Sequence, residues 1–349
     1  MATKRRSKTK PKPKTKARRG GRAGSGRGRR ALTLLAVLLF LGGVVGAAWL
    51  LTRQQAEIPV RTTLLSSAGG AGLAPGALNS PRGLGVAPDG DVYVADLGNG
   101  RVSVYGDDGA FKFVFGKLGP EPGKAKEGQF NEPSGLAVGP DGSVYVADTW
   151  NQRVQKFDPK GKYLSEIDDG FYSPRNVAVD RAGNLYVADT GHSQVKVLDP
   201  TGHELKVLGG PGSGGGEFKE VFGIAINSRG EIFVADPGNR RIQKFSPLPA
   251  ADYIKSVKVP GWKGPEPFWP MLAVDKQDLV YAVDGNNHKF WIYDSVLDYR
   301  GTMGGNDAAE FLTSPLGIGF APDGSLWVSD KDANKLLRLG APAVPPAAR

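Results

Sequence analysis

From residue 78 to residue 340 the chain repeats one pattern of apolar and polar positions six times. In the clearest copy, residues 132–148, an apolar stretch at 135–139 precedes a Pro-Asp-Gly turn, and a second apolar stretch at 144–147 precedes an aspartate. The other copies occupy residues 80–96, 173–189, 220–236, 269–284 and 314–330. Their closing aspartates follow one another at steps of 52, 41, 47, 48 and 46 residues. A period of about 40–50 residues with several short strands is typical of a β-propeller with one repeat per blade.

Each copy predicts four antiparallel strands. After its first two strands, the clearest copy continues with a strand at 153–157, a turn, and an outer strand at 162–167. The second strand is apolar at successive positions, which indicates that both of its faces are buried between neighbouring blades. We therefore expect an all-β fold, a six-bladed propeller of four-stranded antiparallel blades over residues 60–340.

The last blade lacks one strand of its own. The sixth copy ends after a third strand at 335–339, and residues 341–349 are too rich in proline to pair, so we expect a disordered tail there. An apolar stretch at 60–65 precedes the first copy. We expect residues 60–66 to supply the outer strand of the last blade and to close the ring without a free edge.

These motifs resemble the NHL repeat family, whose blades read Pro-x-Gly-hydrophobic, then Asp-Gly, then Tyr-Val-Ala-Asp, then Asn-x-Arg. The resemblance covers residues 78–340 and is strong in the first four copies, whereas the fifth copy departs at 269–273 and 276–278 and the sixth has Ala333 in place of the asparagine. It implies a propeller and a binding role more firmly than an activity. Relatives in this family bind proteins, RNA or small ligands, and a few related six-bladed propellers are enzymes.

The first 52 residues differ from the rest in composition. Residues 1–30 contain 14 Lys and Arg and no acidic residue, so 31 of the chain's 45 basic residues remain against 35 acidic ones, a net charge of −4 for the rest. Residues 31–52 carry no charge and are long enough to cross a bilayer as one helix. We expect a disordered basic tail at 1–30, a transmembrane helix at 31–52 and a linker at 53–59.

The charge beside the apolar segment predicts the topology. Basic residues stay on the cytoplasmic side, so we expect a single-pass protein of the cell membrane with its propeller outside the cytoplasm. The alternative is a signal peptide cleaved near Ala47 or Ala48, which would release a secreted propeller. Nucleic acid is not expected as a partner, because the propeller is mildly acidic and lies outside the cytoplasm.

The aspartate that closes each copy is expected to be structural. In most copies an asparagine follows three residues later and a basic residue five later, so the carboxylate can pair within its own turn. These aspartates are Asp96, Asp148, Asp189, Asp236, Asp284 and Asp330.

Two enzymatic functions are alternatives to a binding role. The resemblance to peptide-amidating lyases implies zinc held by histidines, but His192 and His288 belong to blades that are not neighbours and His203 is expected on the opposite face. The resemblance to calcium lactonases implies carboxylate and amide ligands on the inner strands, which here carry such residues mainly at their ends. The chain has no cysteine. We expect no catalytic residue, no metal and no cofactor.

The positions where the copies differ predict a ligand site at the channel mouth. The residues that open the inner strands are Arg82, Ser134, Arg175, Phe222, Pro270 and Leu316, polar in three blades and apolar in three. The same face carries Trp150, and the link before the fifth copy adds Trp262, Phe268 and Trp269. Aromatic rings beside arginines suit a sugar ring, an anionic glycan or a peptide carboxylate.

The sequence thus predicts a membrane-anchored, extracytoplasmic propeller that acts as a binding or scaffold module for an envelope protein, peptide or glycan. The alternative is a metal-dependent lyase or hydrolase of the six-bladed propeller type.

Overall fold

The computed structural model describes residues 57–263, 269–305 and 311–346. The expected tail at 1–30, the expected helix at 31–52, the first four residues of the expected linker and Phe268 lie outside the described residues. Within the described ranges, no helix combines the length and the apolar character needed to cross a membrane.

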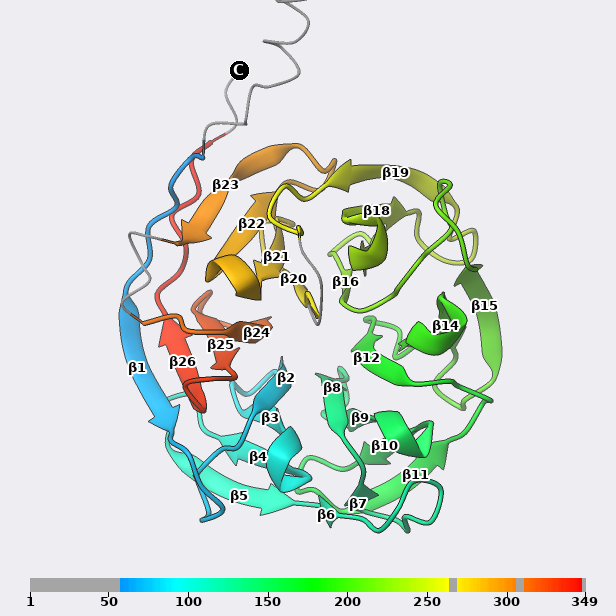
Figure 1. Cartoon of the computed structure of the whole chain (residues 1–349), viewed down its shortest axis with the longest axis vertical. Coiled ribbons are helices and arrows are strands. Elements are labelled where there is room, and N and C mark those ends of the chain that lie inside the picture. Colours follow the sequence, from blue (N-terminus) through cyan, green and yellow to red (C-terminus); the bar gives the residue numbers. More distant parts are fainter. Residues whose placement is uncertain (1–56, 264–268, 306–310, 347–349) are drawn as a thin grey trace, which may run out of the picture. The chain divides into compact units, whose positions relative to one another are not determined.

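The described residues form six four-stranded antiparallel sheets arranged as the blades of a ring (Figure 1). Blade one comprises β2 (Pro81–Val86), β3 (Val92–Asp96), β4 (Arg101–Tyr105) and β5 (Phe111–Phe115). Blade two comprises β8 (Pro133–Val138), β9 (Val144–Asp148), β10 (Arg153–Phe157) and β11 (Tyr163–Ile167). Blade three comprises β12 (Pro174–Val179), β13 (Leu185–Asp189), β14 (Gln194–Leu198) and β15 (Glu204–Gly209).

Blade four comprises β16 (Ile224–Ile226), β17 (Ile232–Asp236), β18 (Arg241–Phe245) and β19 (Tyr253–Lys258). Blade five comprises β20 (Leu272–Val274), β21 (Val280–Asp284), β22 (Lys289–Tyr293) and β23 (Tyr299–Gly304). Blade six comprises β24 (Pro315–Phe320), β25 (Leu326–Asp330), β26 (Lys335–Leu339) and the N-terminal strand β1 (Leu64–Gly69). The link between blades one and two adds a short parallel pair, β6 (Lys117–Leu118) with β7 (Gln129–Phe130). The prediction of an all-β, six-bladed propeller with four antiparallel strands per blade is confirmed.

Strand β1 completes blade six by pairing antiparallel with β26 at the rim of the ring (Figure 1). It begins at Leu64, four residues later than the expected closing strand at 60–66. The apolar stretch at 60–65 was a poor guide to where the strand begins, because an outer strand faces solvent and its residues need not be apolar. Val60 is buried in the core shared by blades five and six instead, and Pro59 bridges to Thr302.

Two terminal segments expected to be free pack on the propeller. At the end of the expected linker, Glu57 forms an ion pair with Lys289 at 2.7 Å. In the expected disordered tail, Ala343 bridges to Arg61, and the carbonyl of Pro345 accepts a hydrogen bond from Arg300. Proline prevents strand pairing, but its carbonyl remains an acceptor.

The apolar cores lie between the blades. Along β9, Val144 and Val146 pack toward blade one, whereas Tyr145 and Ala147 pack toward blade three. The inner strand of each blade touches those of its neighbours, and β24 touches β2, so the ring is closed. The crowding explains the glycine of the Pro-x-Gly motif, since a Cβ on Gly135 would lie 2.6 Å from the Cα of Asn176.

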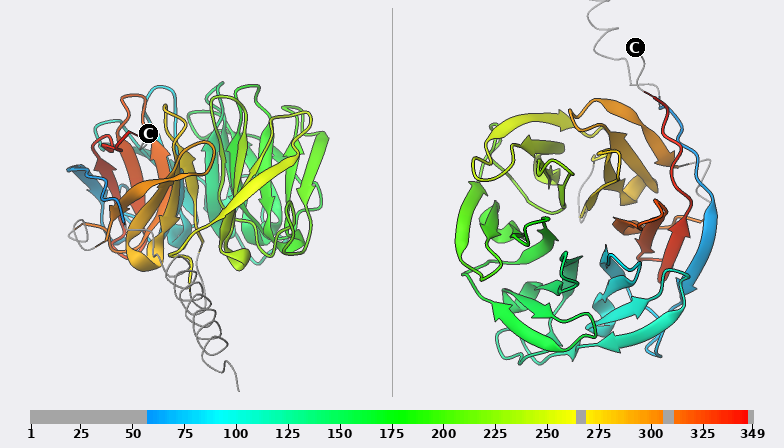
Figure 2. Two further views of the ribbon diagram at one scale, coloured as in Figure 1. Left: turned by 90° about the horizontal axis from the view of Figure 1, so that it is seen from above. Right: turned by 180° about the vertical axis from the view of Figure 1, so that it is seen from behind.

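The strands run between two faces of the ring, seen edge on in Figure 2. We call one the link face; it carries the links between blades and the turns between second and third strands. In blades one to five these turns are short 3-10 helices, listed here in order: η1 (Leu97–Asn99), η2 (Thr149–Asn151), η3 (Thr190–His192), η4 (Pro237–Asn239) and η5 (Gly285–Asn287). The other, which we call the turn face, carries the turns between first and second strands and between third and fourth strands.

Candidate functional site

The six repeat aspartates are fully buried and accept hydrogen bonds from their own blades or from the links that lead into them. Asp148 accepts four hydrogen bonds: from the Asn131 backbone at 2.7 Å, Asn151 at 2.8 Å, and Arg153 and Gln155 at 3.0 Å each. The backbone bond ties the end of the second strand to the incoming inter-blade link. Burial raises the pKa of Asp148 above the ordinary carboxyl value, although the hydrogen bonds from Asn131, Asn151 and Arg153 oppose that shift.

Blades three and five keep the aspartate but change its partners. In blade three, His192 and Gln194 replace the asparagine and arginine, with His192 Nδ1 2.8 Å from the Asp189 carboxylate. In blade five, Trp291 Nε1 donates to Asp284 at 2.9 Å. Burial raises the pKa of Asp284 as well, against the hydrogen bonds from Trp291 and Asn287.

The structure brings six of the predicted mouth residues together on the link face. One small cavity is lined by the predicted Arg82, Ser134, Arg175, Phe222, Trp269 and Leu316, with Met271 in place of the predicted Pro270. The guanidinium carbon of Arg82 lies 3.6 Å from the centre of the Trp269 ring, and that of Arg175 lies 5.9 Å from it. These distances are in the range of cation–π contacts.

One carboxylate sits between the two arginines of the mouth. Glu132 lies 3.6 Å from Arg82 and 3.5 Å from Arg175, both longer than a good charge-assisted hydrogen bond. Arg82 is 7% exposed, and its Nε is buried with no hydrogen-bond partner among the described residues. Burial lowers the pKa of Arg82 to about 10; Glu132 opposes that effect and Arg175 adds to it.

The mouth is packed in this structure. Its cavity has a volume of about 10 Å³, enough for one water at most. Trp150 lies beside it, 46% exposed, with Arg175 5.3 Å from its ring centre. Trp262, which the sequence placed at this site, is instead buried in the core of blades four and five and donates to the Val283 carbonyl at 3.0 Å.

The link face also exposes apolar side chains over blades one to three. Trp150 is 46% and Tyr172 54% exposed, and Leu73 and Leu118 in neighbouring links are 76% and 63% exposed. The Tyr172 ring lies 5.7 Å from that of His192. Large apolar side chains exposed in the links of adjacent blades are typical of protein or ligand contact surfaces.

Behind the mouth, a cavity of about 230 Å³ follows the inner strands of all six blades. Met271 lines both this channel and the mouth. The side-chain amide of Asn176 in blade three donates a hydrogen bond to the Met271 sulfur at 2.9 Å. The channel adjoins a wider cavity of about 450 Å³ on the turn face, since both are lined by Val86, Val138, Val179 and Phe320.

Sequence reasoning missed the turn-face cavity because it interpreted the turns between first and second strands as structural only. A signal was present. Blades one, two and six place Pro88, Pro140 and Pro322 in this turn, whereas blades three and five place Arg181 and Lys276 there.

The histidines do not meet. His192 pairs with Asp189 on the link face, and His203 pairs with Thr201 in a turn of the turn face. Across residues 57–263, 269–305 and 311–346, no three His, Asp or Glu side chains are grouped in a way that could hold a metal ion.

Comparison with known proteins supports the repeat assignment. The model of the NHL repeat matches residues 78–105, 130–157 and 171–198. A B-box type zinc finger protein, ncl-1 of Caenorhabditis elegans, is 49% identical over 49 residues, 14% of this chain and 5% of the relative. A probable peptidyl-alpha-hydroxyglycine alpha-amidating lyase, pgal-1 of the same organism, is 33% identical over 95 residues, 26% of each protein.

Such matches span 4 to 26% of the length of the curated relatives. Among solved structures, a gluconolactonase from Xanthomonas campestris superposes with a TM-score of 0.57 at 14% identity, covering 84% of this chain and 99% of that one. At this identity the likeness shows the fold alone. The chain therefore contains NHL repeats, built into a six-bladed β-propeller.

Proposed function

We propose that this protein is a membrane-anchored binding module whose propeller presents its link face, outside the cytoplasm, to an envelope protein, a peptide or a glycan. One observation carries the proposal. On blades one to three, two arginines share a single loosely held carboxylate, beside tryptophan and tyrosine rings that are about half exposed. Aromatic rings and arginine are the side chains most enriched where binding energy concentrates.

The Arg82, Glu132 and Arg175 group suits an anionic ligand group. The guanidinium groups of Arg82 and Arg175 lie farther from Glu132 than in an ideal carboxylate contact. The Nε of Arg82 has no hydrogen-bond partner among the described residues. A ligand carboxylate placed against Arg82 would gain the bidentate geometry that Glu132 does not supply. Access to Arg82 requires the Trp269 ring to move off it.

The binding test compares matched variants of the full-length protein on glycan and peptide arrays. Trp150→Ala/Tyr172→Ala should abolish the signals seen with wild type. Leu164→Ala removes a side chain with 48% exposure from the outer strand of the same blade as Trp150, so it should bind as wild type does. Equal binding by wild type and the double variant would refute the proposed surface.

The placement in the membrane is supported by 14 basic residues at 1–30 followed by 22 uncharged ones at 31–52. Because the chain has no cysteine, single cysteines report topology cleanly. In intact cells, a membrane-impermeant maleimide should label Ser165→Cys in the propeller and leave Ser7→Cys unlabelled. The reverse pattern, or release of the propeller into the medium, would contradict an anchored, outward-facing propeller.

A metal-dependent lyase or hydrolase is the second candidate, supported by the 95-residue match to a probable amidating lyase. The described residues do not fit such a metal, because their histidines lie apart and their acids do not cluster. We therefore derive no catalytic step. Elemental analysis of the purified protein separates the candidates, since one tightly held zinc or calcium ion per chain would favour the enzyme.

A further inference from the structure

The turn-face cavity is a wide hollow that Asp180, Arg181, Asp275 and Lys276 line with charged side chains. Its volume of about 450 Å³ falls within the range of small-molecule sites. One side is apolar and is formed by blades one, two and six, with Pro88, Pro140, Pro322 and Phe320 among its lining residues. The other side is polar and is formed by blades three and five.

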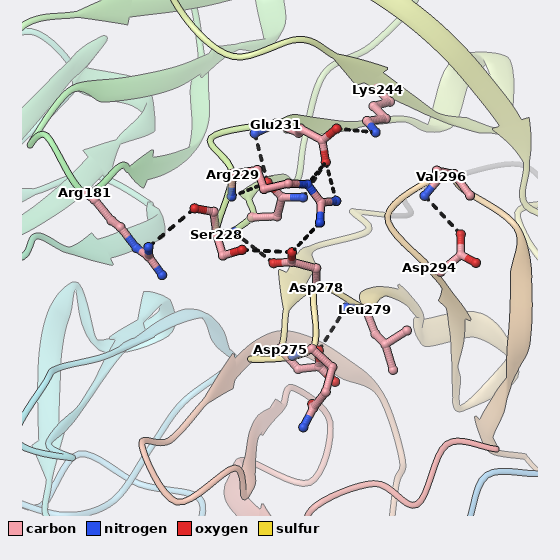
Figure 3. Close-up of polar contacts among 12 residues, drawn as sticks. Arg181, Ser228, Arg229, Glu231, Lys244, Asp275, Asp278, Leu279, Asp294 and Val296 are labelled. Atoms are coloured by element: carbon pink, nitrogen blue, oxygen red, sulfur yellow. Dashed lines mark hydrogen bonds and ion pairs between the residues drawn. The ribbon is translucent and has the colours of Figure 1, made fainter. Parts of the chain in front are cut away.

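Two cations on the polar side have no carboxylate partner. Arg181 makes one contact, to the Ser228 carbonyl at 3.4 Å, and neither it nor Lys276 forms an ion pair among the described residues (Figure 3 shows Arg181). Their neighbours on the same face behave differently. Arg229 lies between Glu231 at 2.7 Å and Asp278 at 2.9 Å, and Lys244 pairs with Glu231 at 2.6 Å.

The two acids that line the cavity are occupied by their own turns. Asp180 accepts bonds from two backbone N–H groups, from Asn184 and from the Tyr186 hydroxyl. Asp275 accepts two backbone bonds and one from the Tyr281 hydroxyl. The donors of Arg181 and Lys276 therefore remain available to a ligand, whereas the carboxylate oxygens of Asp180 and Asp275 are engaged.

We propose that the turn-face cavity binds a small organic anion with an apolar body. Arg181 and Lys276 supply the positive charge for its carboxylate or comparable anionic head, and its apolar body packs on the prolines and Phe320 that also line the cavity. The site is independent of the proposed link-face function, because the packed mouth at Trp269 and Met271 lies at the other end of the channel.

The test uses 4-(trifluoromethyl)benzoate as the probe and fluorine NMR as the readout, with the full-length protein in lipid nanodiscs. Wild type should bind the benzoate saturably. The neutral isostere 4-(trifluoromethyl)benzamide, which lacks the charge, should bind about tenfold more weakly, since charge-assisted bonds are roughly twice as strong as neutral ones.

Variants locate the site. Arg181→Gln/Lys276→Gln should weaken benzoate binding about tenfold, as the loss of two charge-assisted contacts implies. Pro140→Asp should weaken it too by placing a negative charge on the apolar side; blades three and five carry arginine and lysine at this turn position, so it tolerates polar side chains. Lys160→Gln, an exposed cation on the same face outside the cavity, should bind as wild type does.

Circular dichroism checks that each variant is folded. The proposal is overturned if wild type shows no saturable binding, if the amide binds as well as the benzoate, or if folded Arg181→Gln/Lys276→Gln binds within twofold of wild type. None of these results bears on binding at the link face, which the arrays measure. A failure of the turn-face site can therefore be told apart from a failure of the proposed function.

Discussion

Replacing Asp148 by alanine should destabilise the propeller strongly. The substitution leaves four donors around a fully buried position without their acceptor. Arg153 and Gln155 keep other acceptors, notably the Gln129 carbonyl at 3.0 Å, whereas the Asn131 backbone N–H and the Asn151 amide lose the sole acceptor they have among the described residues. Each stranded donor costs about 1–3 kcal/mol, and breaking a buried ion pair costs about 3–5 kcal/mol.

We therefore expect a loss of about 3–5 kcal/mol in the free energy of unfolding. For a folded body of about 290 residues, an unfolding entropy of about 2.1 cal/mol/K per residue converts that loss into a fall in Tm of about 5–8 °C. The assay is thermal unfolding followed by circular dichroism at pH 7, with Asp168→Ala as control, because Asp168 is exposed in the same blade's outgoing link. The control should change Tm by less than about 2 °C. A Tm for Asp148→Ala as close to wild type as the control's would refute the view that these aspartates hold the blades together.

Three further perturbations test other parts of the propeller. Burial raises the pKa of Glu231, but the hydrogen bonds from Lys244, Arg229 and Asn227 outweigh it, so the pKa lies below the ordinary value of 4.5. The ionised Glu231 therefore stabilises the fold above pH 4.5, and this contribution is lost as the pH falls through the lowered pKa. The difference in Tm between wild type and Glu231→Gln should shrink from pH 7 to pH 3, and a constant difference would contradict this. A chain that starts at residue 70 lacks β1 and should be insoluble or unfolded, whereas a chain that starts at residue 57 should fold. A folded monomer starting at residue 70 with unchanged Tm would disprove ring closure by β1. Burial lowers the pKa of Arg82, so its charge costs stability at neutral pH, and Arg82→Met should keep or raise Tm; a fall of more than about 4 °C would show that the guanidinium is structural.

The repeat predicted the fold because each copy carries its own turn residues and buried strands. The closing strand begins four residues later than expected because the apolar stretch at 60–65 combines Val60, which packs in the core, with Leu64 and Leu65, which are exposed on β1. Trp262 was misplaced for a similar reason: its position in a link is visible in the sequence, but its packing into the core beneath that link is not. Arg82, Arg175 and Trp269 were predicted to share a mouth because topology puts the inner strands side by side.

The turn residues of the turn-face cavity are visible in the sequence, but the ion pairing of its cations and the state of the mouth are not. Whether the Trp269 ring lies over Arg82 or away from it depends on side-chain packing across several blades. Arg181 is available to a ligand because Glu231 and Asp278 both form ion pairs with Arg229 instead. Such pairings depend on three-dimensional distances that repeat spacing does not determine.

Site-specific photo-crosslinking tests the proposed binding face most directly. Benzoylphenylalanine is placed at position 150 on the link face or at position 164 on the outer strand of the same blade, two sites of similar exposure, 46% and 48%. In cells that make the full-length protein, position 150 should yield a discrete adduct on irradiation that disappears when Tyr172→Ala and Arg175→Ala are added, and position 164 should yield none. Equal adducts at both positions, or an adduct at 150 that survives the two substitutions, would contradict binding at the link face.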